Sequence, residues 1–350
     1  MIGSREEDLA GVVEHGYGSH ANLKHRLSAV LRAGLGTLVA RLREHVRLRG
    51  QLREPAMTPL ELVNLPALMG LTHGNPDVTI GLIDGPVAVT HPDLAGARIR
   101  EVPGNLARTC TRDGVACQHG TFVAGILAAR RGSQAPAICP GCTLLVRPIF
   151  SEATSRNGQI PSATPEELAG AILECAETGA RVINVSAGLG QPSTKRERAL
   201  EEAFGQATRR GVIVVAAAGN QATLGSSAIT RDPGVVPVVA CDLRGRPISQ
   251  SNLGGSIGKR GLSAPGDEIT SLGANGTPLR FGGTSAATPF VTGTIALLWS
   301  AFPEARPAEI RLAVTQGEAR RRTSVVPPLL DAWAAYHILR ARRQWSGCHG

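Results

Sequence analysis

One glycine-rich stretch carries a serine whose surroundings suit nucleophilic attack. Residues 282–289 read GGTSAATP, and the apolar run that follows is typical of a buried helix. Two glycines permit a tight turn, so Ser285 is predicted to open that helix, with Pro289 in its first turn, where no helical N–H bond is lost. Free amides and the positive helix end could hold an oxyanion there. A plain serine cap is the alternative for this segment alone.

Three more polar residues could support such a serine. Asp84 ends an apolar, β-branched run, His119 lies at the start of a glycine-rich helix, and Asn220 follows a predicted strand. Taken singly, Asp84 and Asn220 are typical of turns, and His119 is typical of a structural helix end. Together the three supply an orienting group, a base and an oxyanion donor for a nucleophile at Ser285.

Predicted strands and helices alternate around these residues. The strands are expected over residues 78–83, 143–149, 181–186, 212–217 and 235–241, and the helices over 118–128, 165–178 and 195–209. This alternation predicts the α/β class, with a parallel sheet covered by helices on both faces. Side chains at the carboxyl ends of such strands meet at one edge of the sheet, which is where an active site is expected.

The first part of the chain is expected to form an extension. The chain has 350 residues and a formal charge of +9, which suits one large domain with an addition. Residues 22–49 repeat leucine and valine at helical spacing among arginines, which predicts an amphipathic basic helix. This helix either packs on the domain, docks an acidic partner or substrate segment, or acts as a propeptide-like brake. The proline-punctuated residues 55–66 are expected to link the extension, residues 1–60, to a domain over 61–345.

The sequence suggests a cytoplasmic protein. Early acidic residues and the lack of an apolar segment after them argue against a signal peptide, and no uninterrupted apolar stretch could span a bilayer, so no membrane partner is expected. The positive charge would suit an acidic peptide, a nucleic acid or an anionic surface, and it does not choose among them.

The cysteines leave three states open. Their number, seven, is odd and does not suggest a secreted disulfide framework. Cys110, Cys117, Cys139 and Cys142 bracket the histidine segment and could be free, disulfide-bonded or bound to zinc, with free thiols favoured. Cys175 and Cys241 are expected to be small core residues.

Four segments resemble, in chain order, the motif blocks of subtilisin-like serine proteases. The segments are residues 84–87 with 91–94, 119–121, 217–220 and 283–289. The resemblance covers about residues 65–339. It implies a three-layer α/β/α fold with a mostly parallel central sheet, and an endopeptidase that forms an acyl-enzyme on a peptide or protein substrate without a cofactor.

The resemblance also implies a role for individual residues. Ser285 would be the nucleophile, His119 the base, and Asp84 the group that orients the imidazole. The side-chain amide of Asn220 and the backbone amide of Ser285 would stabilise the oxyanion. The substrate-binding residues that it implies form two edges and a pocket wall: Gly158, Gln159 and Ile160; Ser186, Ala187 and Gly188; Ala217, Ala218 and Gly219.

Two departures resemble a subgroup of the family. Gly-Pro-Val follows Asp84 where many relatives have serine or threonine and then glycine, and Ala286 replaces a common methionine. With residues 184–188, they resemble the maturation proteases of cyanobactin and similar ribosomal peptide clusters, which implies cleavage of a precursor peptide. A general intracellular degradative protease is the alternative. A basic protein that binds peptide or nucleic acid on an inactive protease scaffold is less favoured, because all four catalytic positions are filled.

Two features common in subtilisins are not expected here. Residues 130–136 stand where many relatives carry a calcium loop, and they hold two arginines and no carboxylate, so no metal is expected there. A ferredoxin-like prodomain is not recognisable either. The basic helix over residues 22–49 would therefore serve folding or regulation in another way, or not at all.

Overall fold

A computed structural model describes residues 57–102, 110–150, 163–186, 197–315 and 324–347. The chain divides into two compact units, Met1–Ala56 and Met57–Gly350, and the described residues all belong to the second unit. The basic helix predicted over residues 22–49 lies outside the described residues.

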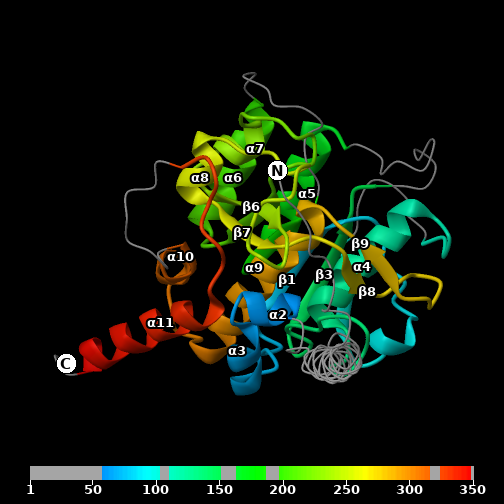
Figure 1. Cartoon of the computed structure of the whole chain (residues 1–350), viewed down its shortest axis with the longest axis horizontal. Helices are drawn as coiled ribbons and strands as arrows, with labels where there is room; N and C mark the ends of the chain where they lie inside the picture. The colour runs from blue at the N-terminus through cyan, green and yellow to red at the C-terminus, as the bar shows by residue number, and fades with distance from the viewer. Residues whose placement is uncertain (1–56, 103–109, 151–162, 187–196, 316–323, 348–350) are drawn as a thin grey trace, which may run out of the picture. The chain divides into compact units, whose positions relative to one another are not determined.

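A parallel sheet of seven strands forms the centre of the second unit (Figure 1). Its strand order is β2 (Arg98–Glu101), β3 (Thr143–Pro148), β1 (Thr79–Asp84), β4 (Val182–Val185), β5 (Ile213–Ala217), β6 (Val235–Cys241) and β7 (Leu262–Pro265). Every pairing in it is parallel, and the register sets Asp84 opposite Pro148 and Leu82 opposite Asn184. The strands from β3 to β7 are buried along their whole length, which explains their runs of apolar residues.

The two faces of the sheet belong to two separate apolar cores. Ile80 and Leu82 of β1 share a core with residues of α4 (Val115–Ala128) and α9 (Thr284–Ala301). Ile83, which alternates with them, belongs to the core shared with α5 (Pro165–Glu177) and α6 (Arg198–Arg209). Helices therefore cover both faces of the sheet, and the predicted three-layer α/β/α fold is confirmed.

The described part of the segment predicted as a link, from residue 57 onward, is largely helical instead. It contains α2 (Pro59–Leu62) and the start of α3 (Leu65–Leu71). Each helix has a proline in its first two positions, where the missing N–H costs no helical bond, and Thr58 and Glu61 form a capping box on α2. Leu65 and Leu68 are fully buried in the core, so this segment is part of the domain rather than a spacer.

The sequence did not predict the smaller elements. A short antiparallel hairpin of β8 (Ile269–Ser271) and β9 (Leu279–Phe281) lies beside α4 (Figure 1). The other short elements are η1 (Pro92–Leu94), α7 (Ala228–Arg231), α8 (Gly255–Arg260) and α10 (Pro307–Thr315). A longer helix, α11 (Ala332–Gly347), follows them, and its first residues belong to the segment 329–335 that resembles the closing helix of subtilisin-like proteases. Among the described residues, no helix is both long and apolar enough to cross a membrane.

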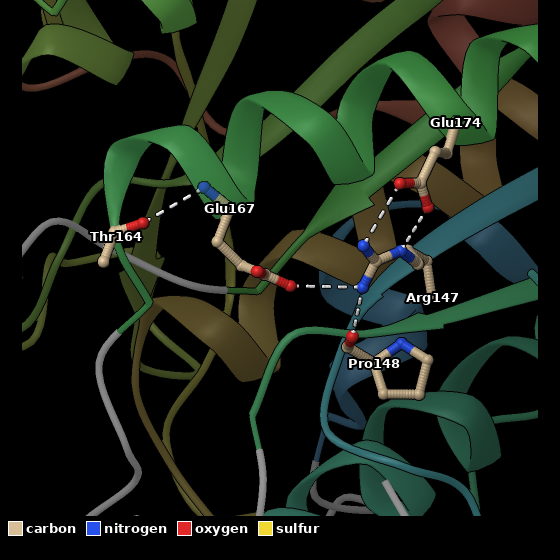
Figure 2. Close-up of polar contacts among 5 residues, drawn as sticks. All are labelled: Arg147, Pro148, Thr164, Glu167 and Glu174. Carbon is tan, nitrogen blue, oxygen red and sulfur yellow. Dashed lines mark hydrogen bonds and ion pairs between the residues drawn. The ribbon is translucent and has the colours of Figure 1, made fainter. Parts of the chain in front are cut away.

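A buried arginine ties β3 to α5 near the carboxyl end of the sheet (Figure 2). Arg147 is 2% exposed and pairs with Glu174 at 2.6 Å and with Glu167 at 3.3 Å, while one of its nitrogens donates to the Pro148 carbonyl. Burial by itself would lower the pKa of the guanidinium, but the bonds and charges of the two glutamates outweigh it and raise that pKa. The cluster therefore holds the end of β3 that lies opposite Asp84.

We expect Arg147→Met to lower the free energy of unfolding by about 1–3 kcal/mol, because it leaves two carboxylates without their cation. The loss is smaller than for a fully buried pair, since Glu174 is 35% exposed and water solvates it. Urea unfolding followed by circular dichroism measures the change. Arg210→Met is the matched control. Arg210 pairs with Glu177, which lies on α5 like the two glutamates that pair with Arg147, but this pair is exposed. Equal, negligible effects of both substitutions would contradict a stabilising role for the Arg147 cluster.

Candidate active site

Asp84 and His119 form a short, buried hydrogen bond. Asp84 ends β1 and is fully buried, and His119 lies near the start of α4 with 4% of its surface exposed. Nδ1 of His119 is 2.6 Å from Oδ1 of Asp84, which also accepts a hydrogen bond from the Gly85 amide at 2.6 Å. An ionised carboxylate can only accept, so this bond requires a proton on Nδ1 and leaves Nε2 of a neutral ring as an acceptor. That Nε2 is buried and has no hydrogen-bond partner among the described residues.

Two glycines allow α4 to approach the end of β1 this closely. A Cβ atom on Gly120 would lie 2.4 Å from the carbonyl oxygen of Gly85, and one on Gly85 would lie 2.0 Å from the carbonyl oxygen of Ala116. A larger residue at either position would push the helix away from the turn. This backbone contact sets the distance between the carboxylate and the imidazole.

Ser285 lies in the first turn of α9, close to elements that contact His119. Phe281 packs edge-on against the imidazole with ring centroids 5.4 Å apart, and α4 packs against α9. Ser285 is 5% exposed, and its hydroxyl forms no hydrogen bond within the described part of the chain. The structure thus joins Asp84 to His119 but shows no bond between His119 and Ser285. Such bonds are often long in free enzymes and tighten on substrate binding.

Asn220 is anchored through its amide oxygen, which leaves the amide nitrogen as a donor. Its Oδ1 accepts hydrogen bonds from the Thr284 amide at 2.8 Å and the Thr284 hydroxyl at 2.9 Å. That hydroxyl accepts in turn from the Gly219 amide at 3.2 Å. The Asn220 nitrogen lies against Gly283, where φ is +118° and a Cβ atom would be 2.8 Å away, so glycine is required there on both counts.

The first turn of α9 offers a second donor. The Thr284 amide donates to Asn220, and the amides of the two residues after Ser285 both donate to the Gly283 carbonyl. The Ser285 amide has no acceptor within the described ranges. It is one of the N–H groups that a helix start leaves unpaired, and it belongs to the same residue as the candidate nucleophile.

Pro289 does not lie in the first turn, contrary to expectation. The helix begins at Thr284, so residue 289 should donate its N–H to the carbonyl of Ser285, four residues earlier. Proline has no N–H, and its ring crowds that carbonyl. The hydroxyl of Ser186 donates to the Ser285 carbonyl at 3.2 Å instead, from the strand side of the helix.

Asn252 was not predicted from the sequence, although it shapes the turn that carries Asn220. Its Oδ1 accepts from the amides of Gln221 and Thr223, and its Nδ2 donates to the Ala218 carbonyl at 3.2 Å. Asparagines are common turn residues, and Asn252 stands between two segments that gave no motif, so sequence spacing alone carried no signal. Thr284 was also missed, because its role depends on a contact with Asn220, which lies 64 residues earlier in the chain.

Comparison with known proteins agrees with this geometry. A sequence model described as the subtilase family matches residues 75–325 of the chain. The chain belongs to the subtilase family. It is 35% identical over 258 residues to the thermophilic serine proteinase of Bacillus sp. (strain AK1), a match that covers 70% of this chain and 57% of that proteinase. The chain thus spans little more than half the length of this curated relative.

Two solved structures resemble this subtilase over most of their own length. The patellamide maturation protease PatA is 31% identical, with a TM-score of 0.67 and coverage of 77% of this chain and 98% of that one. The prenylagaramide maturation protease PagA is 28% identical, with a TM-score of 0.68 and coverage of 79% and 98%. The predicted subtilisin-like fold is confirmed by these likenesses.

The predicted substrate-binding residues of the subtilase are only partly described. Gly158, Gln159, Ile160, Ala187 and Gly188 lie outside the described residues. Ala217, Ala218 and Gly219 form the buried end of β5 and the turn after it, and Ala218 belongs to a small apolar cluster with Val239 and Ile257. A role for these residues in substrate binding stays a prediction.

Two of the cysteines form a disulfide, contrary to the free thiols that the sequence favoured. Cys110 is bonded to Cys117, in the first turn of α4 and close to His119, so the bond fixes the chain that enters this helix. Disulfides persist mainly in oxidising compartments, so this disulfide would be unusual in the cytoplasm, the location expected from the sequence.

The other four cysteines of the described part are free and buried. A hydrogen bond between Cys139 and Cys142 raises the pKa of Cys139, together with burial, and lowers that of Cys142. Cys175 and Cys241 lie in the core as expected, and burial raises the pKa of each to about 12. No cluster that could hold a metal occurs in the ranges described.

Arginines occupy the segment where a calcium loop stands in many subtilases. Arg131 donates hydrogen bonds to the carbonyls of Met69, Thr72 and Ile138, and Arg130 pairs with Asp93 at 2.6 Å. These cations take up backbone carbonyls and a carboxylate of the kind that a calcium ion would need, so the segment is held together by guanidinium groups.

Proposed function

We propose that this subtilase is a serine endopeptidase with Ser285 as nucleophile, His119 as general base and Asp84 as the group that orients the imidazole. The observation that carries the proposal is the 2.6 Å bond between Asp84 and Nδ1 of His119, together with the unpaired Nε2 on the other side of the ring. A base needs this arrangement, because the carboxylate fixes both the tautomer and the ring orientation. The alternative function, a basic binding protein built on an inactive protease scaffold, has no comparable support.

Proton transfer follows from the environment of the pair. His119 Nε2 takes the proton of the Ser285 hydroxyl as Oγ attacks the scissile carbonyl, and the imidazolium that forms is stabilised by the buried Asp84 carboxylate. The same proton then goes to the leaving amine, which departs as the acyl-enzyme forms. Water, activated by His119 in the same way, releases the acid product and restores the serine.

Charge on the attacked carbonyl oxygen is stabilised by two donors. The Asn220 side-chain nitrogen and the Ser285 amide stand beside the start of α9, and neither has an acceptor among the residues that the structure describes. Because Asn220 is held through its oxygen by Thr284, its nitrogen needs little reorganisation when charge develops. The positive end of the α9 dipole adds to the effect.

Ser285→Ala should abolish peptide cleavage and labelling by a fluorophosphonate, because it removes the hydroxyl that is proposed to attack. Asn220→Ala should retain labelling at Ser285 but lower kcat by about 100-fold to 1,000-fold, since one oxyanion donor is lost. Intact-mass and peptide-level mass spectrometry locate the label. Persistent labelling of the Ser285→Ala variant at another residue would contradict the assignment.

For the substrate, we infer a ribosomally made precursor peptide that is cut to release a leader or follower. The support is the likeness to PatA and PagA, both named as maturation proteases. The Gly-Pro pair after Asp84 and the fully buried Ala286 after the nucleophile also resemble this subgroup. The cytoplasmic location, where such peptides are synthesised, remains part of this proposal.

A maturation enzyme should cut a precursor peptide at one site and leave denatured casein largely intact. We expect the purified chain, given precursor peptides encoded beside its gene, to yield two products by mass spectrometry. A subtilisin run in parallel degrades both substrates and serves as the control. Rapid digestion of casein to many fragments would instead support a general degradative protease.

A further inference from the structure

Asn184 of β4 and Ser186, the residue just after this strand, face the helix that carries the candidate nucleophile. Val182, Asn184 and Ser186 alternate with Ile183 and Val185, which belong to the core on the other face of the sheet. Asn184 is fully buried and Ser186 is 6% exposed. A buried amide and a buried hydroxyl destabilise a fold unless they are hydrogen-bonded, so their partners show what they are for.

Their partners form a directed chain that ends on Ser285. The Thr292 hydroxyl donates to Oδ1 of Asn184 at 2.9 Å, and Nδ2 of Asn184 donates to the Ser186 hydroxyl at 2.7 Å. Ser186 in turn donates to the Ser285 carbonyl at 3.2 Å. Thr292 is also on α9, about two turns after Ser285. One strand residue therefore links two turns of the same helix.

Pro289 gives this chain its importance. The Ser285 carbonyl lacks its usual helical donor, because residue 289 has no N–H to offer it. A buried carbonyl without that donor would leave the first turn of α9 weakly held at the very residue that has to attack. Ser186 restores a donor, and Asn184 fixes the Ser186 hydroxyl in the orientation that reaches the carbonyl.

We propose that Asn184 is a positioning residue for Ser285. It acts through Ser186 to set the backbone of the nucleophile, and hence the distance from Oγ to Nε2 of His119. The proposal rests on the assignment of Ser285 as nucleophile. Displacement of a reacting group by about 1 Å can lower a rate by about 100-fold, so loss of this hold should be visible in the chemical step.

The test measures the reaction of Ser285 with a small alkyl fluorophosphonate, which needs no knowledge of the peptide substrate. The maximal rate of labelling and the concentration for half-maximal rate are obtained by intact-mass spectrometry. We expect Ser186→Ala and Asn184→Leu to lower the maximal rate by about 10-fold to 100-fold, with the half-maximal concentration changed by less than about 3-fold. Thr292→Val should lower the maximal rate less, because Asn184 keeps its hydrogen bond to Ser186.

Thr294→Val is the matched control. Thr294 is a buried threonine of the same helix, and within the described ranges its hydroxyl bonds only to its own helix, at the Phe290 carbonyl. Its labelling rate should stay near that of the unsubstituted chain. Thermal unfolding of each variant shows whether it folds, and Ser186→Ala is the milder variant should Asn184→Leu fail to fold.

A second substitution separates positioning from a general contribution to stability. Pro289→Ala returns an N–H to residue 289, so the Ser285 carbonyl regains its helical donor. In that background, Ser186→Ala should slow labelling by less than about 3-fold. An equal loss in both backgrounds, an unchanged rate for Ser186→Ala, or an effect confined to the half-maximal concentration would each overturn the proposal. Ser285→Ala is treated with the same reagent alongside the other variants. If this variant is still labelled, Ser285 is not the nucleophile. If its labelling is lost, a negative result for the other variants contradicts the Asn184 proposal alone.

Discussion

The hydrogen bond between Asp84 and His119 is the constraint on which the site depends. It joins the carboxyl end of a central strand to a helix that follows more than thirty residues later. Gly85 and Gly120 let the two backbones approach closely enough for this bond, and the Cys110–Cys117 disulfide lies at the start of the same helix. A side chain at either glycine would separate the carboxylate from the imidazole even if both residues were retained.

The nucleophile side of the site is held in a comparable way, by contacts between the sheet edge and one helix start. Thr284 is bonded to the turn after β5, and the Ser285 carbonyl is bonded to Ser186 after β4. The helix lacks one hydrogen bond in this turn, because Pro289 has no N–H to donate to the Ser285 carbonyl. Strand ends therefore position both the base and the nucleophile, while the helices supply the amides and the dipole.

Sequence patterns predicted the parts of this arrangement that rest on local chemistry. Runs of β-branched residues marked the central strands, and the polar residues after them indicated the edge where Asp84 and Asn220 lie. Residues whose role depends on distant contacts, such as Asn252 and Thr292, carried no local signal. Asn184 stood in the segment 184–188 that resembles the subgroup, but its contacts with Ser186 and Thr292 were not predicted. The prediction that Pro289 lies in the first turn was wrong, because the helix begins at Thr284, five residues before the proline. The short strands β2, β8 and β9 were missed, since sheet pairing rather than sequence period defines them.

A crystal structure of the chain inhibited by a peptidyl phosphonate would test the central claim most directly, because it captures the geometry of the tetrahedral intermediate. We predict phosphorus bonded to Oγ of Ser285, a phosphonyl oxygen within hydrogen-bonding distance of the Asn220 nitrogen and the Ser285 amide, and Nε2 of His119 facing the leaving-group side. Phosphorus on another residue, or an imidazole that remains bonded to Asp84 but stays far from the adduct, would contradict the account.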